Sequence, residues 1–443
     1  MRLQTGILLG KLLLHTARMF KVGGGTSAPG LYALKIDPNL VEKLVKQVPI
    51  NIIITGTNGK TTTARLLAHF AIRFGLKVIR NSAGSNLERG IASTLISHSS
   101  LLTLNSELSK FDLGIWELDE AAFNQLAPVI KPDKIVFLNI HRDQLDRYGE
   151  INSVLDRWQS TLKKLKPKTK LIINGDDHNL SKLTEGFNGK INRFGLEEGK
   201  ISGEFTDKNI KPAKLDIVAK NIQLLGLTGS KFDLFTATHP SYGGHSSQLT
   251  AHLPLPGFYH IYDFLAAFSA GLTLKIPANI MTDSLTQFIP AFGRVEKLSL
   301  KNNKEGFIFL IKNPVGATQV FQTLSSELTA QDSLLIALND NLADGTDVSW
   351  IWDSLFEEFK IKNLKFKIIV SGTRALDLAL RLKYAGFETK QIQIEPSLER
   401  ALQTSQTALN GRLFILPTYT ALLELQAQLT KQGIKPLHWS KLR

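Results

Sequence analysis

The chain has 443 residues, of which 43% are hydrophobic, so it is long enough for several compact domains with sizeable cores. It contains no cysteine, which excludes disulfides, zinc sites built from thiolates and a cysteine nucleophile. A formal net charge of +14 favours an anionic partner such as nucleic acid, a membrane surface or a polyanionic substrate, although scattered solvated lysines would give the same charge. No apolar run reaches the length of about 18 residues that a membrane-spanning helix needs.

Residues 1–22 predict an amphipathic helix in which leucines are interspersed with arginine and lysine. A helix packed on the rest of the protein is the simpler interpretation, and a helix lying on a membrane surface is the alternative. The segment lacks the small-residue cleavage site of a signal peptide, so we do not expect one. A glycine-rich loop at 23–30 and a short helix at 38–48 follow.

Residues 52–63 predict a nucleotide-binding loop. A run of β-branched residues indicates a buried parallel strand, Gly56 ends it, and apolar residues at helical spacing follow. In a strand–loop–helix unit of this kind, backbone N–H groups and the helix N-terminus hold phosphates. Lys60 then neutralises the phosphates and the Thr61 hydroxyl binds Mg²⁺.

This loop is a shortened variant of the usual phosphate-binding pattern. That pattern has a glycine five residues before Gly59, where this chain has Ile54. An ordinary strand–turn–helix with an incidental lysine is the alternative. We interpret the segment as an ATP site.

Further expected strands place polar residues beside this loop. Residues 77–79, 113–117 and 135–139 each indicate a strand. Ligands of open parallel sheets sit at the carboxyl ends of the strands, which makes Asn86 and Glu117 candidates for the site. Glu117 suits a second Mg²⁺ ligand because Mg²⁺ prefers hard oxygen donors. For Asn86, loop formation is the commoner explanation.

The pattern changes along the rest of the chain. We expect a further strand at residues 171–174, short antiparallel hairpins at 190–255 and a helix at 257–274. The last third alternates strands and helices, which indicates a parallel sheet with crossover helices. Two polar turns stand out there, at 339–347 and 371–374.

Taken together, these motifs resemble the Mur ligase family, and within it the MurT-type ligase subunits. The resemblance to the family as a whole is carried by Thr55 to Thr62, Asn139 with Asp143, Asp146-Arg147-Tyr148, and Asn174-Gly175-Asp176-Asp177. The closer resemblance is carried by Gly25-Thr26-Ser27 with Pro29-Gly30, Lys35-Ile36-Asp37, Arg142-Asp143-Gln144, Lys312-Asn313-Pro314 with Gly316, Asn339-Asp340-Asn341 through Asp347 to Ile351, Gly372-Thr373-Arg374, and Pro417 with Tyr419. It covers essentially the whole chain.

The resemblance implies an α/β fold in three parts. Residues 1–48 would form a helical and loop lead-in. Residues 49–292 would form a Mur-ligase-like central P-loop domain, with a parallel sheet and a small antiparallel β subregion. Residues 293–443 would form a Rossmann-like C-terminal α/β domain that binds a glutaminase.

The implied reaction is ATP-dependent amidation of the D-glutamate α-carboxylate in the lipid II stem peptide to D-isoglutamine, a step of peptidoglycan biosynthesis. ATP would convert the carboxylate to an acyl phosphate, which ammonia then displaces, and the protein would hold the reacting groups in line. In this reaction Lys60 would stabilise the transferring phosphoryl group, and Thr61 and Glu117 would hold Mg²⁺. The implied nucleotide-binding set is Thr57, Asn58, Gly59, Lys60, Thr61, Thr62, His260 and Arg294. His260 and Arg294 match positions near the base and sugar, and packing at a helix start is an equally open role for His260.

The resemblance also implies a partner, a glutaminase of the GatD type, which would supply ammonia within a heterodimer. Asp347 matches the aspartate that such ligase subunits contribute to the partner's catalytic triad, where it would orient an imidazolium. The alternative is that the cluster containing Asp347 only caps the following helix. The expected location is cytoplasmic, with peripheral attachment at the inner face of the membrane as an option.

Three departures from the family pattern change these expectations. Many relatives carry a four-cysteine zinc ribbon, and a chain without cysteine is expected to hold no zinc in that way. Gln144 stands where amino-acid-adding ligases have histidine. Those ligases also have a carbamoylated lysine shortly afterwards, whereas residues 148–161 of this chain contain no lysine. A second Mg²⁺ held by such residues is therefore in doubt. Ile261 and Asp263 stand where related ligases often have asparagine, so contacts to adenine are expected to differ.

Two other functions compete with this one. A ligase similar to folylpolyglutamate synthetases, adding an amino acid to a carboxylate, would explain the phosphate loop but not the cluster around Asp347. A basic, non-catalytic nucleotide-binding protein acting on nucleic acid would need aromatic residues interleaved with basic ones, and the sequence has no such stretch.

Overall fold

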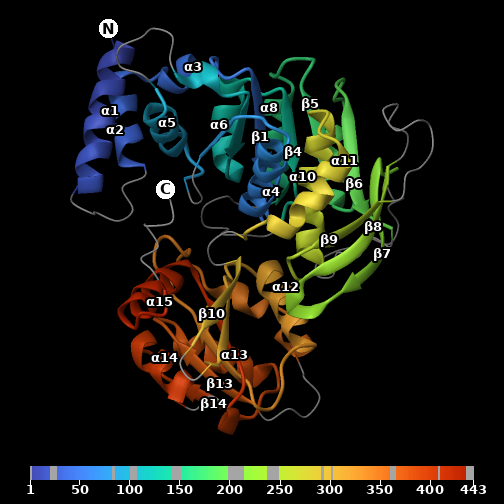
Figure 1. Ribbon diagram of the computed structural model, residues 1–443. Coiled ribbons are helices and arrows are strands. Elements are labelled where there is room, and N and C mark those ends of the chain that lie inside the picture. Colours follow the sequence, from blue (N-terminus) through green and yellow to red (C-terminus); the bar gives the residue numbers. More distant parts are fainter. Residues whose placement is uncertain are drawn as a thin grey trace.

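The structure, a computed structural model, is described for residues 2–19, 27–81, 85–99, 107–141, 151–197, 214–236, 249–290, 294–300, 303–359, 366–407 and 410–435. Within these ranges the chain forms two sheets, each covered by helices, which lie one above the other in Figure 1. We refer to them as the central sheet and the C-terminal sheet. No described helix is both long and apolar enough to cross a membrane.

The central sheet has the strand order β2-β3-β1-β4-β5-β6-β7-β8-β9. Its strands are β1 (Ile50–Thr55), β2 (Val78–Arg80), β3 (Leu113–Glu117), β4 (Lys134–Phe137), β5 (Lys170–Asn174), β6 (Ile191–Leu196), β7 (Ile217–Leu224), β8 (Ser230–Thr236) and β9 (Leu249–Leu253). All neighbouring strands from β2 to β7 in this order, β1 included, pair in parallel. Strand β8 pairs antiparallel with both β7 and β9. The expected strands and the parallel sheet around the phosphate loop are therefore confirmed.

The expectation for residues 190–255 was only partly right. The antiparallel hairpins are present as β7–β9, and they extend the central sheet. Strand β6, however, pairs in parallel with both β5 and β7, so the prediction of a hairpin strand there was wrong. The crossover into β6 contains only the short helix α9 (His178–Ser181) and a 3₁₀ turn, which are too short to show a helical period in the sequence.

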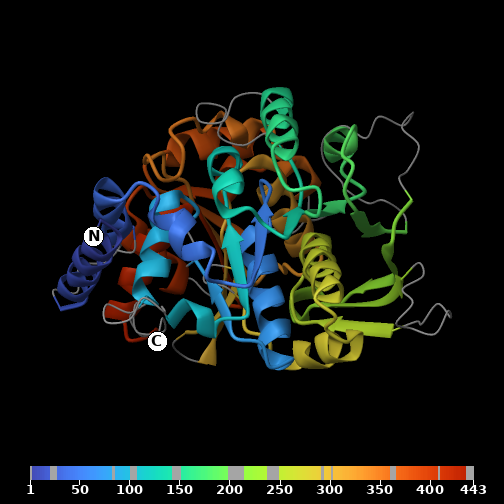
Figure 2. The ribbon, with the colours of Figure 1, turned by 90° about the horizontal axis from the view of Figure 1, so that it is seen from above.

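Helices cover both faces of the central sheet because its parallel strands are apolar on both sides. Ile52 and Ile54 of β1 belong to one hydrophobic core, and Ile53 between them belongs to the other. The first core is closed by α4 (Lys60–Arg73), α10 (Phe258–Thr273) and α11 (Ala278–Asp283), and the second by α3 (Leu40–Val45), α5 (Glu88–Ser97), α6 (Glu120–Ile130) and α8 (Ile151–Leu162). Figure 2 shows α4 and α10 on one side of the strands and α6 and α8 on the other.

The N-terminal segment forms two helices, α1 (Arg2–Met19) and α2 (Ala28–Ile36), which pack on each other and on α5. The close approach of α2 to α5 depends on Gly30, because a Cβ there would lie 1.9 Å from the Arg89 carbonyl oxygen. The interpretation of residues 1–22 as a packed helix is confirmed for the part that the structure describes. Of the loop expected at 23–30, the glycines at 23–25 lie outside the described residues. Residues 28–30 already belong to α2, so the loop prediction was wrong there.

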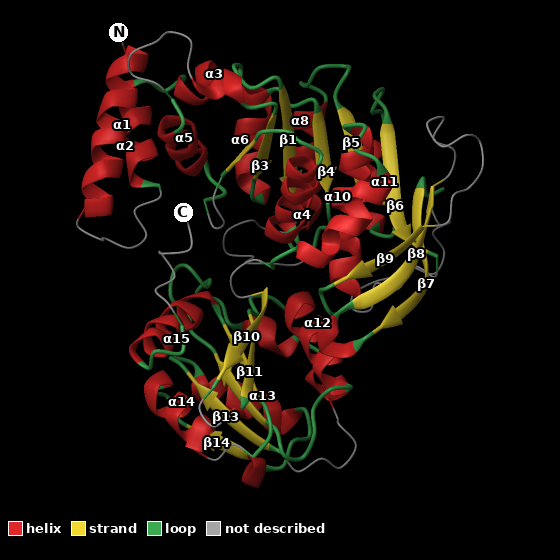
Figure 3. Ribbon diagram, in the orientation of Figure 1, coloured by secondary structure: helices red, strands yellow, loops and turns green. Residues whose placement is uncertain are grey.

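The C-terminal sheet has the order β10-β11-β15-β12-β13-β14. Its strands are β10 (Arg294–Ser299), β11 (Glu305–Phe309), β12 (Ser333–Ala337), β13 (Lys367–Ser371), β14 (Ile392–Ile394) and β15 (Leu413–Pro417), and its helices are α12 (Pro314–Ser325), α13 (Ala375–Tyr384), α14 (Leu398–Thr407) and α15 (Tyr419–Lys431). The strands pair in parallel except β10, which runs antiparallel to β11 and was not expected. The predicted alternation of strands and crossover helices is confirmed. Figure 3 shows α12 at the end of this sheet that faces the central sheet.

Candidate phosphate-binding and ligase site

The phosphate loop connects β1 to α4 through two glycines with positive φ angles. Gly56 has φ 134° and Gly59 has φ 87°, a backbone region that other residues rarely adopt. A Cβ at Gly56 would lie 2.8 Å from the Asn139 carbonyl oxygen, and one at Gly59 would lie 2.0 Å from Asp263 Oδ1. Both glycines are thus required by conformation and by close neighbours.

Lys60 begins α4 and folds back over the loop. Its ammonium donates to the Gly56 carbonyl and, at 3.0 Å, to the Thr57 carbonyl, and the residue is 9% exposed. A buried lysine held by loop carbonyls at a helix N-terminus lies where an anionic phosphate would be stabilised by charge and by the helix dipole.

The first turn of α4 presents two more hydroxyl groups. Thr61 Oγ1 donates to Glu117 Oε2 at 2.8 Å, which joins the loop to the end of β3. Glu117 is fully buried, and its backbone is fixed by Asn81, whose amide accepts from Glu117 N–H and donates to the Glu117 carbonyl. Thr62 Oγ1 is buried and has no hydrogen-bond partner among the described residues, which suits a phosphate oxygen as its partner.

The pairing of Thr61 with Glu117 fits a magnesium ion. Hydroxyl and carboxylate oxygens are hard donors, and Mg²⁺ typically takes one or two protein ligands together with phosphate oxygens and water. Within the described ranges no group of three or more His, Asp or Glu residues could enclose a metal by itself. Asn86, the other residue singled out at this edge, has a buried amide oxygen without a partner among the described residues.

The middle of the loop is held by the loop that follows β4. Asn139 accepts from Asn58 N–H at 2.8 Å and donates to the Asn58 carbonyl at 3.2 Å. Thr57 Oγ1 accepts from His141 N–H at 3.1 Å. Residues 142–150, which include the motifs around Asp143 and Gln144, lie outside the described residues.

Two residues that follow β11 of the C-terminal sheet reach the phosphate loop. Lys312 Nζ donates to the Thr57 carbonyl at 3.2 Å, and Asn313 Nδ2 donates to Asn58 Oδ1 at 2.9 Å. Asn313 is itself fixed, because its Oδ1 accepts from Gly316 N–H at 2.9 Å and so caps α12. The C-terminal sheet therefore brings an additional positive charge to the loop.

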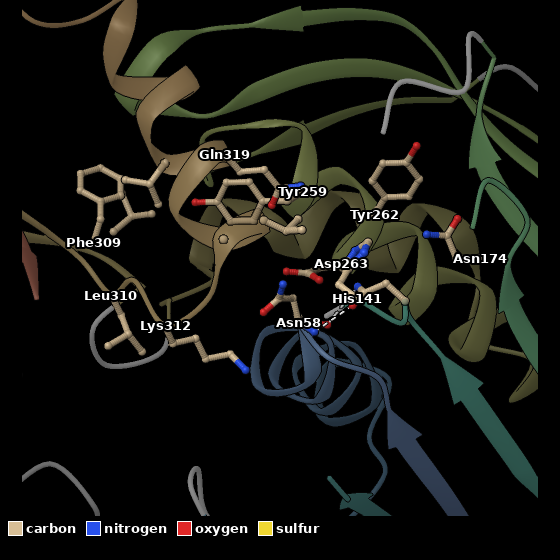
Figure 4. A pocket seen from close by; sticks show the side chains of 16 residues that line it. Asn58, His141, Asn174, Tyr259, Tyr262, Asp263, Phe309, Leu310, Lys312 and Gln319 are labelled. Atoms are coloured by element: carbon tan, nitrogen blue, oxygen red, sulfur yellow. Dashed lines mark hydrogen bonds between the residues drawn. The ribbon is translucent and has the colours of Figure 1, made fainter. Parts of the chain in front are cut away.

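A pocket opens between the two sheets beside these contacts. Figure 4 shows Asn58, His141 and Asp263 on one side and Leu310, Lys312 and Gln319 on the other. The remaining lining residues are Gly59, Asn139, Asn174, Tyr259, Tyr262, Val295, Phe309, Val315, Gly316 and Val320. Aromatic and aliphatic side chains next to a phosphate loop suit a nucleoside.

His260 and Arg294 stand differently toward this pocket. His260 is 1% exposed, its Nδ1 lies 3.1 Å from Asp263 Oδ2, and it is not among the lining side chains, whereas Asp263 is. The structure therefore places His260 behind Asp263. Arg294 begins β10 opposite Phe309, next to the lining residue Val295, and its side chain lies outside the described part of the chain.

Two carboxylates, half-buried Asp176 and buried Asp177, follow β5 near the pocket residue Tyr262. Burial raises the pKa of Asp176, whose Oδ2 accepts from the Tyr262 hydroxyl at 2.8 Å. Burial also raises the pKa of Asp177 to about 6, although its Oδ2 accepts from Ile140 N–H. Burial and the neighbouring Asp176 charge raise the pKa of Tyr262 well above its ordinary value. The contact of Asp177 with Ile140 fixes the loop after β4, which carries His141.

Asp347 lies elsewhere, on the surface of the C-terminal sheet. Its side chain is exposed, and its Oδ1 accepts from Ser349 N–H at 2.8 Å, in a turn just before the 3₁₀ helix η7 (Ser349–Trp352). Because η7 has Val348 as its N-cap residue and no side-chain cap hydrogen bond, the structure shows a local turn at Asp347 rather than a side-chain helix cap. Exposure leaves the carboxylate accessible to another protein. Asp344, by contrast, is turned inward, where its Oδ1 accepts from Thr420 N–H.

Exposed apolar side chains lie on α13 and on η7, the 3₁₀ helix that Asp347 precedes. Leu376, Leu380 and Tyr384, spaced four residues apart on α13, are 69%, 48% and 70% exposed. Trp352 of η7 contacts Tyr384, with ring centroids 5.6 Å apart. We call these four residues the α13 surface. Beneath it the Arg381 guanidinium donates to the carbonyls of η7 and of the turn that follows it, which holds η7 against α13.

Sequence reasoning missed the contacts that cross between the sheets. Lys312 and Asn313 belong to a recognisable sequence motif, but their partners Thr57 and Asn58 lie 255 residues earlier. An Asn-Pro pair before a helical pattern does indicate a helix cap, and this was the available signal. Nothing local could have shown which loop the cap would meet.

Comparison with known proteins agrees with this geometry. Residues 54–271 match the family described as Mur ligase middle domain, and residues 310–422 match the family described as MurT ligase C-terminal. The chain is 30% identical to the lipid II isoglutaminyl synthase (glutamine-hydrolyzing) subunit MurT of Staphylococcus aureus strain COL, over 97% of this chain and 98% of the relative. It is 29% identical to the corresponding Streptococcus pneumoniae R6 subunit, over 94% of each chain.

Among solved structures, MurF from Acinetobacter baumannii superposes with a TM-score of 0.68 at 18% identity, covering 92% of this chain and 81% of that one. At this identity the likeness concerns the fold alone, and the expected Mur-ligase architecture is confirmed. The relatives and the matched families show that this chain belongs to the MurT-type subunits of the Mur ligase family.

Proposed function

We propose that this chain is the ATP-dependent ligase subunit of an enzyme that amidates the D-glutamate α-carboxylate of lipid II. The observation that carries the proposal is the contact between the two sheets at the phosphate loop. The loop supplies Lys60 and Thr61, and Lys312 reaches it from the C-terminal sheet. The relatives that match over nearly the whole chain are named lipid II isoglutaminyl synthase subunits. The two sheets support the proposed division into a lead-in at 1–48, a central domain at 49–292 and a C-terminal domain at 293–443.

The chemistry needs two displacements. A carboxylate oxygen attacks the γ-phosphorus of ATP and releases ADP, which gives an acyl phosphate. Ammonia then attacks the carbonyl carbon and phosphate leaves, with loss of a proton from nitrogen. Because little covalent chemistry falls to the protein, its contribution is to position the groups and to stabilise the transferring phosphoryl group.

Three features of this chain suit these tasks. Lys60 and the N-terminus of α4 stabilise charge on the phosphates, and Lys312 adds a cation from the opposite sheet. Thr61 and Glu117 would hold Mg²⁺, which neutralises phosphate charge when bound. The proposed nucleotide contacts of Thr57, Asn58, Gly59, Thr62 and Arg294 complete the set, and His260 would act on the nucleotide only through Asp263.

Ammonia would come from a glutaminase of the GatD type. The relatives are named as subunits of a glutamine-hydrolyzing enzyme, and this chain has no cysteine with which to attack glutamine itself. Exposed Asp347 supports a role in orienting the partner's catalytic histidine. The α13 surface, which includes Trp352 of the 3₁₀ helix after Asp347, offers the aromatic and aliphatic side chains that anchor protein partners.

The test is lipid II amidation with glutamine or with free ammonia, using the chain alone, the complex with the glutaminase, and the complex carrying Asp347→Asn. We expect the complex to use both nitrogen sources and the chain alone to use only ammonia. Asp347→Asn should abolish the use of glutamine and leave the use of ammonia intact. Asp353→Asn is a matched control, because Asp353 is an exposed aspartate at the end of the same 3₁₀ helix.

Two outcomes would overturn parts of this proposal. Addition of an amino acid by the chain alone would replace amidation with the chemistry of amino-acid-adding ligases. An Asp347→Asn complex with unchanged glutamine use would remove Asp347 from the partner's triad and leave it the local turn contact with Ser349. Failure of ATP hydrolysis under all conditions would contradict the ligase assignment itself.

A further inference from the structure

The two N-terminal helices carry large apolar side chains that face away from the protein. Leu8 and Leu12, one turn apart on α1, are 55% and 58% exposed. Leu31 and Tyr32 on the adjoining helix α2 are 40% and 47% exposed. Single exposed leucines are ordinary, but four such side chains on one helix pair call for a partner. We call these four residues the α1–α2 face.

The α1–α2 face is not needed for packing the helices onto the protein. The opposite side of α1 already contacts the body, with Ile7 buried to 5% exposure. A Cβ at Gly10 on that side would lie 2.9 Å from the Ile96 side chain of α5, so α1 sits as close as its backbone allows. The exposed leucines are therefore available to something outside this chain.

In the sequence of the same segment, every charged residue is basic. Residues 1–36 contain no aspartate or glutamate, and their basic residues are Arg2, Lys11, Arg18, Lys21 and Lys35. The first carboxylate, Asp37, is buried and paired with Lys43 at 2.8 Å. Lys35 extends over the Tyr32 ring, 5.4 Å from its centroid, so charge and apolar surface are adjacent.

Exposed leucines and an aromatic residue on helices that carry only positive charge are the combination that binds an anionic lipid surface. The apolar side chains enter the headgroup region and the basic side chains contact lipid phosphates. Each basic residue near such a surface strengthens binding about fivefold. A surface that binds another protein does not need to lack carboxylates. Charge complementarity between the basic segment and anionic lipid headgroups therefore favours the bilayer.

The helix pair is also connected to the proposed site. Figures 1 and 2 both place α1 and α2 at the end of the central sheet opposite β7–β9. They pack on α5, and Gly30 N–H of α2 donates to Ser93 Oγ of α5 at 2.8 Å. The loop that leads into α5 is held at Ser85 by Asn81, which also binds the backbone of Glu117. One helix thus separates the α1–α2 face from the proposed Mg²⁺ ligand.

We propose that the α1–α2 face docks this chain on an anionic lipid bilayer and so presents the ligase site to a membrane-held substrate. The choice of a bilayer rests in part on the proposed function, because a lipid-linked substrate stays in the membrane. Docking requires neither ATP nor the reaction, and it is measured without either.

The experiment is co-sedimentation of the full chain with vesicles of phosphatidylcholine alone or mixed with phosphatidylglycerol. We expect binding to the mixed vesicles that weakens with added salt, and little binding to phosphatidylcholine alone. The double variant Leu8→Glu with Leu12→Glu should bind the mixed vesicles about tenfold more weakly or worse, because it loses apolar burial and adds repulsion. Both sites are exposed and glutamate is a good helix former, so the fold should persist.

A matched control is Leu225→Glu, at a leucine that is 47% exposed near β7 at the far end of the sheet. It should bind vesicles as the unmodified chain does. A charge variant, Lys11→Gln with Lys35→Gln, should weaken binding to mixed vesicles and flatten its salt dependence.

Several results would overturn the proposal. These are no binding by the unmodified chain, equal binding by the double variant, and equal binding to neutral and anionic vesicles. A double variant that loses self-association in light scattering but still binds vesicles would assign the face to a second copy of the chain. Amidation of detergent-solubilised lipid II separates this proposal from the proposed function, because the double variant should retain that activity whether or not it docks.

Discussion

Asn58 of the phosphate loop and Asn313 of the C-terminal sheet exchange two side-chain hydrogen bonds, at 2.9 and 3.3 Å. Each asparagine is also held by its neighbours. The backbone N–H of Asn58 donates to Asn139 beside the central sheet, and Asn313 caps α12 beside the C-terminal sheet. The pair therefore joins two rigid elements without a flexible intermediate. It sets how far Lys312 lies from the loop that would hold the phosphates.

Breaking this amide pair is expected to impair catalysis more than stability. Asn313→Asp keeps an oxygen to cap α12 but loses the donor to Asn58, and Asn58→Ala removes the other half. Because both changes break the same contact, a double-mutant cycle on kcat/KM for ATP should show coupling of about 1 kcal/mol. Strictly additive effects would mean that the pair does not control the site, and thermal unfolding of each variant checks the fold.

Lys60 is expected to be essential for ATP hydrolysis. Lys60→Met keeps the length of the side chain but removes the ammonium that lies over the loop carbonyls. We expect ATP turnover to fall about a hundredfold or more, because a positioned charge on the transferring group is lost. Lys164→Met, at an exposed lysine, is the control and should leave turnover unchanged. Near-normal turnover in Lys60→Met would contradict the assigned role.

The hydroxyl of Thr61 can be tested through the magnesium requirement. Thr61→Ala removes the oxygen that pairs with Glu117, whereas Thr61→Ser retains it. If Thr61 is a Mg²⁺ ligand, the alanine variant should need a higher Mg²⁺ concentration for half-maximal ATP hydrolysis. The serine variant should stay close to the unmodified protein. An identical Mg²⁺ requirement in all three proteins would argue that Glu117 and the phosphates hold the ion without Thr61.

The α13 surface is expected to bind the glutaminase. Leu376→Asp with Leu380→Asp places charges on side chains that are 69% and 48% exposed, so folding should persist. We expect affinity for a GatD-type partner, measured by calorimetry, to fall about tenfold or more if these residues lie at the centre of the contact. Ammonia-dependent amidation should be unaffected. Leu225→Asp, on a distant strand connection, is the control, and equal losses in both variants would reject the surface.

The sequence allowed the phosphate loop to be located because its strand, glycines and Lys60-Thr61 are contiguous, and a contiguous motif has its own local pattern. Glu117 followed from the rule that ligands collect at the carboxyl ends of parallel strands. The approach of Lys312 to Thr57 could not be derived in this way, since it depends on how two sheets pack across 255 residues. The parallel pairing of β6 could not be predicted from the sequence, because the crossover that leads into β6 is too short to show a helical period.

The buried carboxyl of Asp177 leads to a prediction about pH. Burial raises its pKa in the folded protein to about 6, while the unfolded chain has the ordinary value of about 4. The folded state thus binds the proton more tightly, so this group stabilises the fold fully below about pH 4 and the contribution is lost as pH rises through about 6. A difference of about two pKa units corresponds to about 3 kcal/mol.

Asp177→Asn removes this titration, so the unmodified protein and the variant should differ in a pH-dependent manner. The unfolding temperature of the unmodified protein minus that of Asp177→Asn should fall between about pH 4 and pH 6 and level off above about pH 7. Scanning calorimetry at several pH values measures this difference directly. Asp133→Asn is a suitable comparison, because Asp133 also accepts a backbone N–H, from Asn51 at 2.8 Å, but in an exposed position. A difference that stays constant or grows with pH would show that Asp177 is ionised in the folded protein throughout this range.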